Sequence, residues 1–356
     1  MLDTGCATTT SALTTWPTAS TELAMSTARG ILPALITLLL IGTDTVGAQA
    51  AALASAAGDD RARCASGEID ACVRVETAGC DTGDAKACRS LAGRYFNSVG
   101  VPLERMRAGR MMTRAFRLAD SACTAGDLGG CAIAGLAYGT GQGAPPDVVR
   151  GRGLVERACA GGDAEGCYAV GYASLVGTLG FERDTVRAAR LLESTCAGGH
   201  SSACFQLGWN YEYGRTVTLD HVQAAVFYYQ ACEVALTGED MLGCHFLGSA
   251  YSEGRGVPMD AIRAAQLFDR ACQNGNGNGC NNLGQLIQEG RVGASRDPAN
   301  AATLYDRACQ LGNPSGCNNL GILHQRGYGV ERDKGRAKQL WKRACELGHK
   351  AACEYR

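Results

Sequence analysis

Paired cysteines are the residues of this sequence best placed to do chemistry. In ACQLGNPSGCNNLG, residues 308–321, Cys309 and Cys317 stand eight apart across a turn-rich segment. The same spacing recurs along the chain, except that one pair is twelve apart. The pairs are Cys64/Cys72, Cys80/Cys88, Cys123/Cys131, Cys159/Cys167, Cys196/Cys204, Cys232/Cys244, Cys272/Cys280, Cys309/Cys317 and Cys345/Cys353. Only Cys6 is left over, so one kind of chemistry has to explain the rest.

Three kinds of chemistry use paired cysteines: metal binding, thiol redox exchange and disulfide cross-linking. Zinc sites favour cysteines two to four residues apart in sets of four ligands, and the five histidines show no matching rhythm. Redox-active pairs are typically Cys-X-X-Cys. A disulfide across a short loop fits better, and it stabilises a fold by about 2–3 kcal/mol. We therefore expect structural disulfides, with neither a metal nor a cofactor.

The even spacing of the first four cysteines leaves two pairings open. Spacing alone allows a bond between Cys72 and Cys80 as well as the local pairs 64–72 and 80–88. A Gly-Glu or Gly-Asp turn falls inside each local pair and not between residues 72 and 80, which favours the local choice.

The N-terminal region indicates the compartment. Residues 25–50 contain Arg29, an apolar core from Ile31 to Ile41 and a small-residue site at 48–50, the layout of a secretory signal. The apolar core is short for a membrane span, so membrane contact is expected only through an uncleaved signal. The Ser/Thr-rich residues 1–24 read as a disordered or misassigned start. Dense cysteine pairing also favours an oxidising compartment, so we expect a periplasmic or secreted bacterial protein.

Length and self-similarity predict a repeat array. The 356 residues exceed the usual domain size, and the net charge of −1 leaves no basic footprint for a nucleic-acid partner. Measured between the second cysteines of the pairs, units recur every 36 to 43 residues. Seven full units begin at Cys88, Cys131, Cys167, Cys204, Cys244, Cys280 and Cys317.

Each unit reads as two helices, here called helix A and helix B. In the unit from residue 244, Leu247 and Tyr251 share one face of a first helix, which the glycines of EGRGVP end. Asp260 then caps a second helix, on which Phe268 follows two alanines at helical spacing. The cysteines join helix B to the next helix A.

The phrases LGSAYSEGRGVPMDAIRAAQLFDRA (247–271) and LGILHQRGYGVERDKGRAKQLWKRA (320–344) resemble the Sel-one-like repeat family, relatives of the tetratricopeptide repeats. The paired cysteines resemble its secreted bacterial branch, the Helicobacter cysteine-rich proteins. This resemblance implies an all-α fold, a right-handed α-solenoid of about seven disulfide-stapled helix-turn-helix repeats over residues 88–356. Capping helices are expected in residues 51–87. Three units depart from the pattern: Glu104 replaces a capping Asp, SLVGTLGFERD (174–184) is a bulkier turn, and Pro145-Pro146 precedes the capping Asp147.

Two stripes run along the A helices. Positions three, four and seven after the opening cysteine are uniform, with glycine at the second of them in six units, and they predict the core. Positions two, five and nine point almost the opposite way and vary between units, as a recognition surface would. We expect partner binding there, in a concave groove, by Ile133, Leu136, Tyr172, Val176, Gln206, Trp209, Tyr213, Phe246, Asn282 and Asn319. The alternative is that part of this stripe is extra core between neighbouring A helices.

Catalytic patterns are sparse. The sequence has no Ser-X-X-Lys and no Gly-X-Ser-X-Gly, and His200 beside Ser201 is only a sequence neighbour. We predict a scaffold that binds a protein or peptide, including a peptidoglycan-derived one, and that is not an enzyme. The resemblance to the cysteine-rich branch implies an alternative, penicillin binding or weak β-lactamase activity, for which no catalytic residue can be assigned.

Overall fold

The computed structural model describes residues 58–64, 68–97, 99, 101, 104–235, 241–293 and 296–355. No strand occurs in these ranges. The predicted signal at 25–50, the preceding residues 1–24 with Cys6, and residues 51–57 lie outside them. Within the described residues no helix is both long and apolar enough to cross a membrane.

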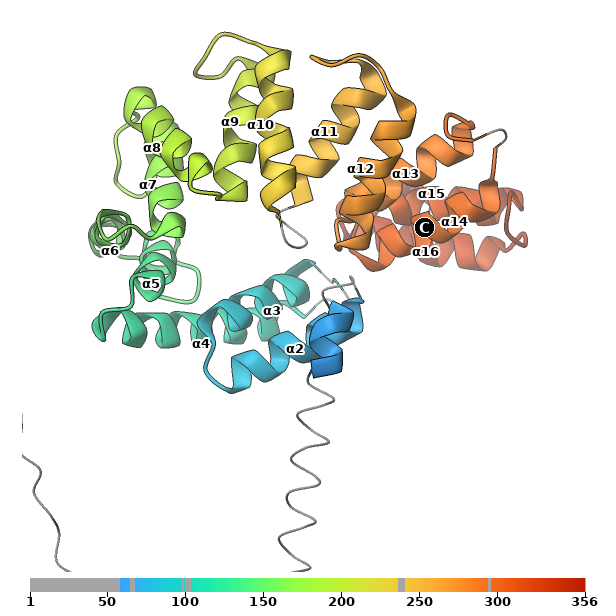
Figure 1. The fold of residues 1–356 in the computed structure, drawn as a ribbon. Helices are drawn as coiled ribbons and strands as arrows, with labels where there is room; N and C mark the ends of the chain where they lie inside the picture. The colour runs from blue at the N-terminus through green and yellow to red at the C-terminus, as the bar shows by residue number, and fades with distance from the viewer. Residues whose placement is uncertain are drawn as a thin grey trace, which may run out of the picture. The chain divides into compact units, whose positions relative to one another are not determined.

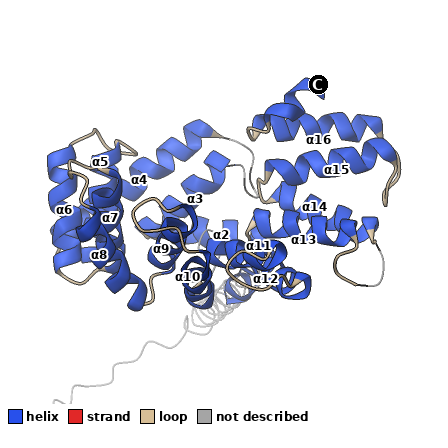
Figure 2. Ribbon diagram, turned by 90° about the horizontal axis from the view of Figure 1, so that it is seen from above, coloured by secondary structure: helices blue, strands red, loops and turns tan. Residues whose placement is uncertain are grey.

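The described residues form a right-handed solenoid of paired helices (Figures 1 and 2). The A helices are α3 (Ala85–Asn97), α5 (Leu128–Thr140), α7 (Ala164–Val176), α9 (Ser201–Tyr213), α11 (Leu242–Glu253), α13 (Gly277–Glu289) and α15 (Pro314–Arg326). The B helices are α4 (Arg105–Thr124), α6 (Val148–Ala160), α8 (Thr185–Ala197), α10 (His221–Val234), α12 (Ala261–Gln273), α14 (Pro298–Gln310) and α16 (Lys334–Glu346). Helix α2 (Ile69–Asp81) precedes them and the 3-10 helix η2 (Lys350–Tyr355) follows.

The capping residues predicted from the sequence do begin and end the helices. Asp260 accepts hydrogen bonds from the backbone N–H groups of Ile262 and Arg263, and equivalent aspartates cap α6, α8, α10, α14 and α16. Gly254 ends α11 in the left-handed conformation at φ 72°. Helix A begins two or three residues before the cysteine taken as the start of the unit, so that cysteine lies in its first turn.

All nine cysteine pairs form disulfides, with the local pairing that the turns favoured. Cys64 bonds Cys72 and Cys80 bonds Cys88, so a bond between Cys72 and Cys80 does not form. The Cα atoms of the bonded pairs lie 4.3 to 4.9 Å apart. From the third pair on, each bond joins the last turn of a B helix to the first turn of the next element. The third to eighth bonds therefore link consecutive repeats covalently.

The repeats stack so that the A helices approach one another. Each helix packs chiefly on its neighbours in sequence, and the contacts between next-but-one helices join A helices, as in α5 with α7 and α13 with α15. Within each unit, glycines of helix A allow helix B to pack closely on it. A Cβ on Gly208 would lie 2.6 Å from the ring of Tyr228, and one on Gly248 would lie 2.8 Å from that of Phe268. The A helices therefore line the inner surface of the stack.

In the third unit, a phenylalanine of the bulkier turn takes the place of the tyrosine that other units carry on helix A. In α3, α5 and α11 the tyrosine seven places after the cysteine lies under an arginine of the paired B helix, as Arg150 lies 4.3 Å from the ring of Tyr138. The third unit has the buried Ser174 at this position. Phe181 of the turn is buried instead, with Arg152 and Arg187 over its ring at 4.6 and 5.3 Å.

Candidate functional site

The first unit of the predicted binding stripe belongs to the core. Ile133 of α5 is only 5% exposed and packs with Ala119 and Ala134. Leu136 is half-buried against the cluster around Val155. The expectation of an exposed Ile133 was therefore wrong, and the alternative of extra core holds there. Helix α5 consists largely of glycine and alanine, so its neighbours approach closely enough to cover the larger side chains.

From α7 to α11 the stripe is open and aromatic. Tyr172 and Val176 of α7 are 41% and 44% exposed, and Tyr213 of α9 is 47% exposed. Trp209 is half-buried between Tyr213 and Phe246, with ring centroids 4.5 and 5.2 Å away. We call the rings of this region the aromatic strip. It comprises two groups of contacting rings, Tyr168 with Tyr172, and Phe205 with Trp209, Tyr213 and Phe246.

Two members of the aromatic strip were missed in the sequence. Tyr168 and Phe205 stand one place after the cysteine, not two, yet they contact Tyr172 and Trp209 at centroid distances of 6.1 and 5.9 Å. Both are half-buried. The recurrence of an aromatic residue next to the cysteine in two consecutive units was the available signal.

From α11 to α15 the stripe becomes a chain of side-chain amides, which we call the amide ladder. It comprises His245, Asn282, Asn281 and Asn319. The Asn282 amide donates to His245 Nε2 at 3.0 Å, the Asn281 amide donates to Asn282 Oδ1 at 3.2 Å, and the Asn319 amide donates to Asn281 Oδ1 at 3.0 Å. The phrase CNNLG, present at both 280–284 and 317–321, could have revealed Asn281.

The amide ladder keeps hydrogen-bonding capacity. An asparagine side chain has two N–H donors and two acceptor lone pairs, and each bond above uses one of these. Asn282 and Asn319 are half-buried, so their remaining groups lie near the inner surface. Gln206, the other polar residue predicted in the stripe, donates to Asn210 at 3.0 Å within α9.

His245 joins the two halves of the inner surface. Its ring lies between Phe246 and Phe268, at 5.0 and 5.9 Å. Burial lowers the pKa of His245 to about 4. The imidazole is therefore neutral at physiological pH and Nε2 accepts the bond from Asn282. Its Nδ1 has no hydrogen-bond partner among the described residues.

A charged cluster borders the aromatic strip. Glu165 of α7 lies 3.4 Å from His200 Nε2 and 3.2 Å from Arg89 of α3. The hydrogen bond from His200 and the charge of Arg89 hold the pKa of Glu165 at about 2. The His200 ring stacks on Tyr168 at 5.1 Å, and burial raises the pKa of Tyr168 to about 12. The cluster ties together three A helices, α3, α7 and α9.

His200 and Ser201 do not form a nucleophilic pair. His200 Nδ1 accepts the backbone N–H of Ala203, which caps α9, and Nε2 faces Glu165. The buried Ser201 hydroxyl donates to the carbonyl of Ala231. The eighteen paired cysteines are disulfide-bonded, so none of them offers a thiolate. Among the described residues no three His, Cys, Asp or Glu side chains gather in a metal-ligating group.

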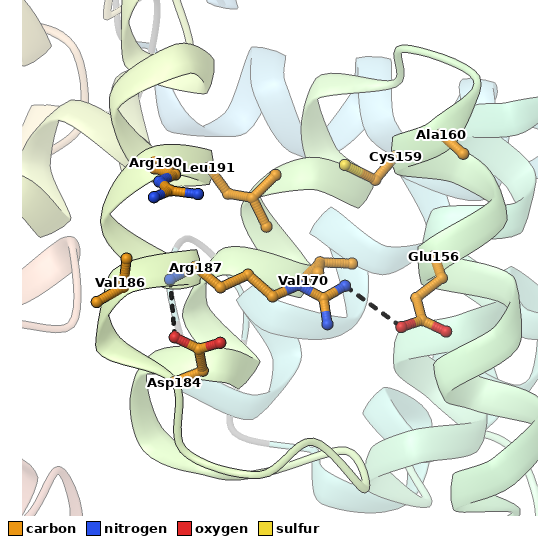
Figure 3. A pocket seen from close by; sticks show the side chains of 9 residues that line it. All are labelled: Glu156, Cys159, Ala160, Val170, Asp184, Val186, Arg187, Arg190 and Leu191. Atoms are coloured by element: carbon orange, nitrogen blue, oxygen red, sulfur yellow. Dashed lines mark hydrogen bonds and ion pairs between the residues drawn. The ribbon is translucent and has the colours of Figure 1, made fainter.

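Two cavities lie away from the stripe. One, of 570 Å³, lies between α6 and α8 and is lined by Glu156, Val170, Val186, Arg187, Arg190 and Leu191, among others (Figure 3). The other, of 640 Å³, lies at the start of α4 and includes Glu346 of α16. None of the residues predicted from the stripe lines either cavity.

A family model described as Sel1 repeat matches six segments that together cover more than half of the chain. The segments are residues 130–163, 164–200, 201–234, 242–276, 277–313 and 314–349. A search of curated proteins found no match.

Solved structures share the fold. A Sel1 repeat protein from Oxalobacter formigenes is 22% identical with a TM-score of 0.55, over 84% of this chain and 88% of that one. A protective antigen of uropathogenic Escherichia coli that displays an SLR fold is 24% identical with a TM-score of 0.52, over 83% of this chain. The chain spans 65% of that antigen's length. Cysteine-rich protein B of Helicobacter pylori is 30% identical over 37% of this chain and 92% of that one, with a TM-score of 0.31.

Proposed function

Because the chain belongs to the Sel1 repeat family, we propose that it is a scaffold that binds an extended peptide segment of a partner on its inner surface. Members of the family generally mediate protein–protein interactions. The observation that carries the proposal is the continuity of the aromatic strip with the amide ladder, which meet at His245 and Phe246.

The two halves of the inner surface offer different contacts to a peptide. Half-exposed rings such as Tyr172 and Tyr213 present apolar area that gains free energy when a partner covers it. An extended peptide carries a backbone N–H and C=O at every residue, and these groups need partners when they leave water. The remaining groups of Asn282 and Asn319 supply such partners without selecting a side chain. The aromatic half therefore confers specificity and the ladder fixes the backbone.

The compartment follows from the disulfides. Nine disulfides are typical of a protein that folds outside the reducing cytoplasm. A periplasmic or secreted location also rests on the predicted signal at 25–50. N-terminal sequencing of the exported protein should find cleavage after Ala50. A mature chain that retains residues 31–41 would contradict the cleaved signal.

Selection from a random peptide library, followed by affinity measurement, tests the binding proposal. Stem peptides of peptidoglycan belong in the same panel because they present the same backbone groups. Replacing Trp209 and Tyr172 by Ala should lower the affinity for a selected peptide by about tenfold or more, since buried aromatic anchors dominate such interfaces. Replacing Asn282 and Asn319 by Ala should lower the affinity for peptides of unrelated sequence, and by a similar factor for each of them.

Tyr229 provides the matched control. It is 56% exposed on α10, a B helix away from the inner surface, so Tyr229→Ala removes a similar ring from the outside. Peptide affinity should be unchanged in this variant. Peptides that bind the Trp209/Tyr172 variant as tightly as the wild type would show that the inner surface is not the binding site.

A further inference from the structure

A second apolar surface runs along the edge where the B helices begin. Five consecutive B helices carry a large exposed apolar residue at their second position. These residues, which we call the apolar row, are Met106, Val149, Val186, Val222 and Ile262, and their exposed fractions range from 58% to 84%. Leu219 and Met259, one residue before the caps of α10 and α12, add exposed fractions of 54% and 71%. The sequence analysis, aligned on the A helices, did not find this row.

Along this edge, A–B connections of three units pack on the B helix of the unit before. The Arg152 guanidinium of α6 donates to the carbonyl of Gly180 in the next connection at 2.8 Å. Gly256 lies so close to the backbone of His221, at the start of α10, that a Cβ there would meet it. A Cβ on Gly143 would likewise meet the backbone of Met112 of α4. Neighbouring members of the row therefore belong to one surface.

Arginines alternate with the apolar row. Arg107, Arg150, Arg187 and Arg263 each follow a member of the row. They stack on aromatic rings and form ion pairs with Glu104, Asp120, Glu156 and Asp260, and their side chains remain 43% to 63% exposed. Arg105, Arg110 and Arg183 are exposed and form no ion pair with the described residues. Several acidic groups of this edge are the caps Asp147, Asp184 and Asp260, whose oxygens accept backbone N–H groups.

Both cavities open on this edge, and each combines a member of the row with arginines. The cavity of 570 Å³ is lined by Val186, Arg187 and Arg190 with the apolar Val170 and Leu191, and by the acidic Glu156 and Asp184, of which Glu156 pairs with Arg187 (Figure 3). The cavity of 640 Å³ is lined by Met106 with Arg105, Arg107 and Arg110, and by Glu104 and Glu346. Each therefore offers cationic donors beside apolar area.

We propose that this edge docks on an anionic phospholipid bilayer. Aliphatic side chains of the apolar row reach the boundary between headgroups and acyl chains, and the arginines contact the phosphates. Bidentate guanidinium groups suit phosphate oxygens. A bilayer explains the two components together, because it presents negative charge and apolar depth along an extended surface. The contact is peripheral and separate from the inner surface proposed to bind peptide.

Vesicle sedimentation with the full, oxidised chain tests the proposal. Vesicles of phosphatidylcholine alone are compared with vesicles containing about 30% phosphatidylglycerol, at low and high salt. The row variant Val149→Asp, Val186→Asp and Ile262→Asp should bind the anionic vesicles at least about tenfold more weakly than the wild type. The second variant, Arg105→Glu, Arg110→Glu and Arg183→Glu, should lose the preference for anionic over neutral vesicles.

A matched control lies on α10. Val226→Asp, Tyr229→Asp and Val234→Asp change three residues that are 43%, 56% and 38% exposed, away from the helix start, and should leave vesicle binding unchanged. Because every variant keeps residues 25–50, a contribution of that segment is common to all. Equal binding by the row variant and the wild type would overturn the proposal. Loss of a wild-type dimer in the row variant, with vesicle binding intact, would instead identify a second copy as the occupant.

Discussion

The side-chain amide of Asn282 on α13 donates to Nε2 of His245 on α11, across the boundary between two repeats, at 3.0 Å. An amide nitrogen cannot accept this bond, so Nε2 has to be unprotonated. The low pKa of His245, about 4, keeps it so. The same residue contacts Phe246. A single neutral imidazole therefore holds the polar half of the inner surface against the aromatic half.

The first prediction concerns the dependence of stability on pH. The unfolded chain protonates His245 near its ordinary pKa of 6.5, whereas the folded chain does so only near pH 4. Between these values the unfolded state binds more protons, so the free energy of unfolding should fall as the pH is lowered from 6.5 towards 4. The slope from this residue is at most about 1.4 kcal/mol per pH unit. Urea unfolding at several pH values measures it.

His245→Phe serves as the comparison, because the ring would sit among the same aromatic neighbours without titrating. The low pKa of Glu165, about 2, affects stability only below its ordinary value of 4.5. The interval from pH 6.5 to 4.5 therefore isolates His245. Identical slopes for the wild type and His245→Phe in that interval would contradict the neutral, buried imidazole.

The repeat architecture was predictable because its signals are local and recur. The eight-residue cysteine spacing, the glycine that ends helix A and the aspartate that caps helix B each depend on a few neighbouring residues. All recur often enough to exclude chance, and the disulfides and caps of the structure confirm them.

The exposure of single residues was less predictable because it depends on the neighbouring repeat. Ile133 and Tyr172 both belong to the predicted binding stripe. The alanine- and glycine-rich α5 is nevertheless covered by its neighbours, while the end of α7 is exposed. Phe181 replaces an aromatic ring from a turn, outside any helical register. The apolar row was missed for a related reason, since alignment on the cysteines of helix A does not bring the starts of the B helices into register.

The second prediction concerns the disulfides. Replacing Cys309 and Cys317 by Ser should lower the free energy of unfolding by about 2–3 kcal/mol, because the loop they close regains entropy in the unfolded chain. The same change at Cys345 and Cys353 should have less effect on the other repeats, since this pair joins α16 only to the terminal η2. Urea unfolding followed by circular dichroism compares the two. Full reduction that leaves both mobility and melting unchanged would contradict the role of the bonds.

The third prediction is that the oxidised protein does not turn over a chromogenic β-lactam. His200 and Ser201 are engaged by Glu165 and by backbone groups, and the paired cysteines are disulfide-bonded. Neither His200 with Ser201 nor any of the paired cysteines is therefore poised as a nucleophile with an adjacent base. A buffer blank and a reduced sample are the controls. Turnover above the blank that disappears on reduction would require a catalytic site that depends on the folded repeats.

The fourth prediction separates glycines needed for packing from glycines that are not. Gly248→Ala places a Cβ 2.8 Å from the ring of Phe268, so it should destabilise the fold by about 1–3 kcal/mol through overpacking. Gly153→Ala in α6 meets no atom within 4 Å. Because alanine loses less backbone entropy in a helix, Gly153→Ala should instead stabilise by about 0.5–1 kcal/mol.

Chemical denaturation of both variants, each made in the wild-type protein, measures these two changes in the free energy of unfolding, which should have opposite signs. Since both changes add the same methyl group within a helix, the difference between them isolates the packing of helix A against helix B. Equal and stabilising effects would mean that α11 packs less closely on α12 than the contact between Gly248 and Phe268 requires.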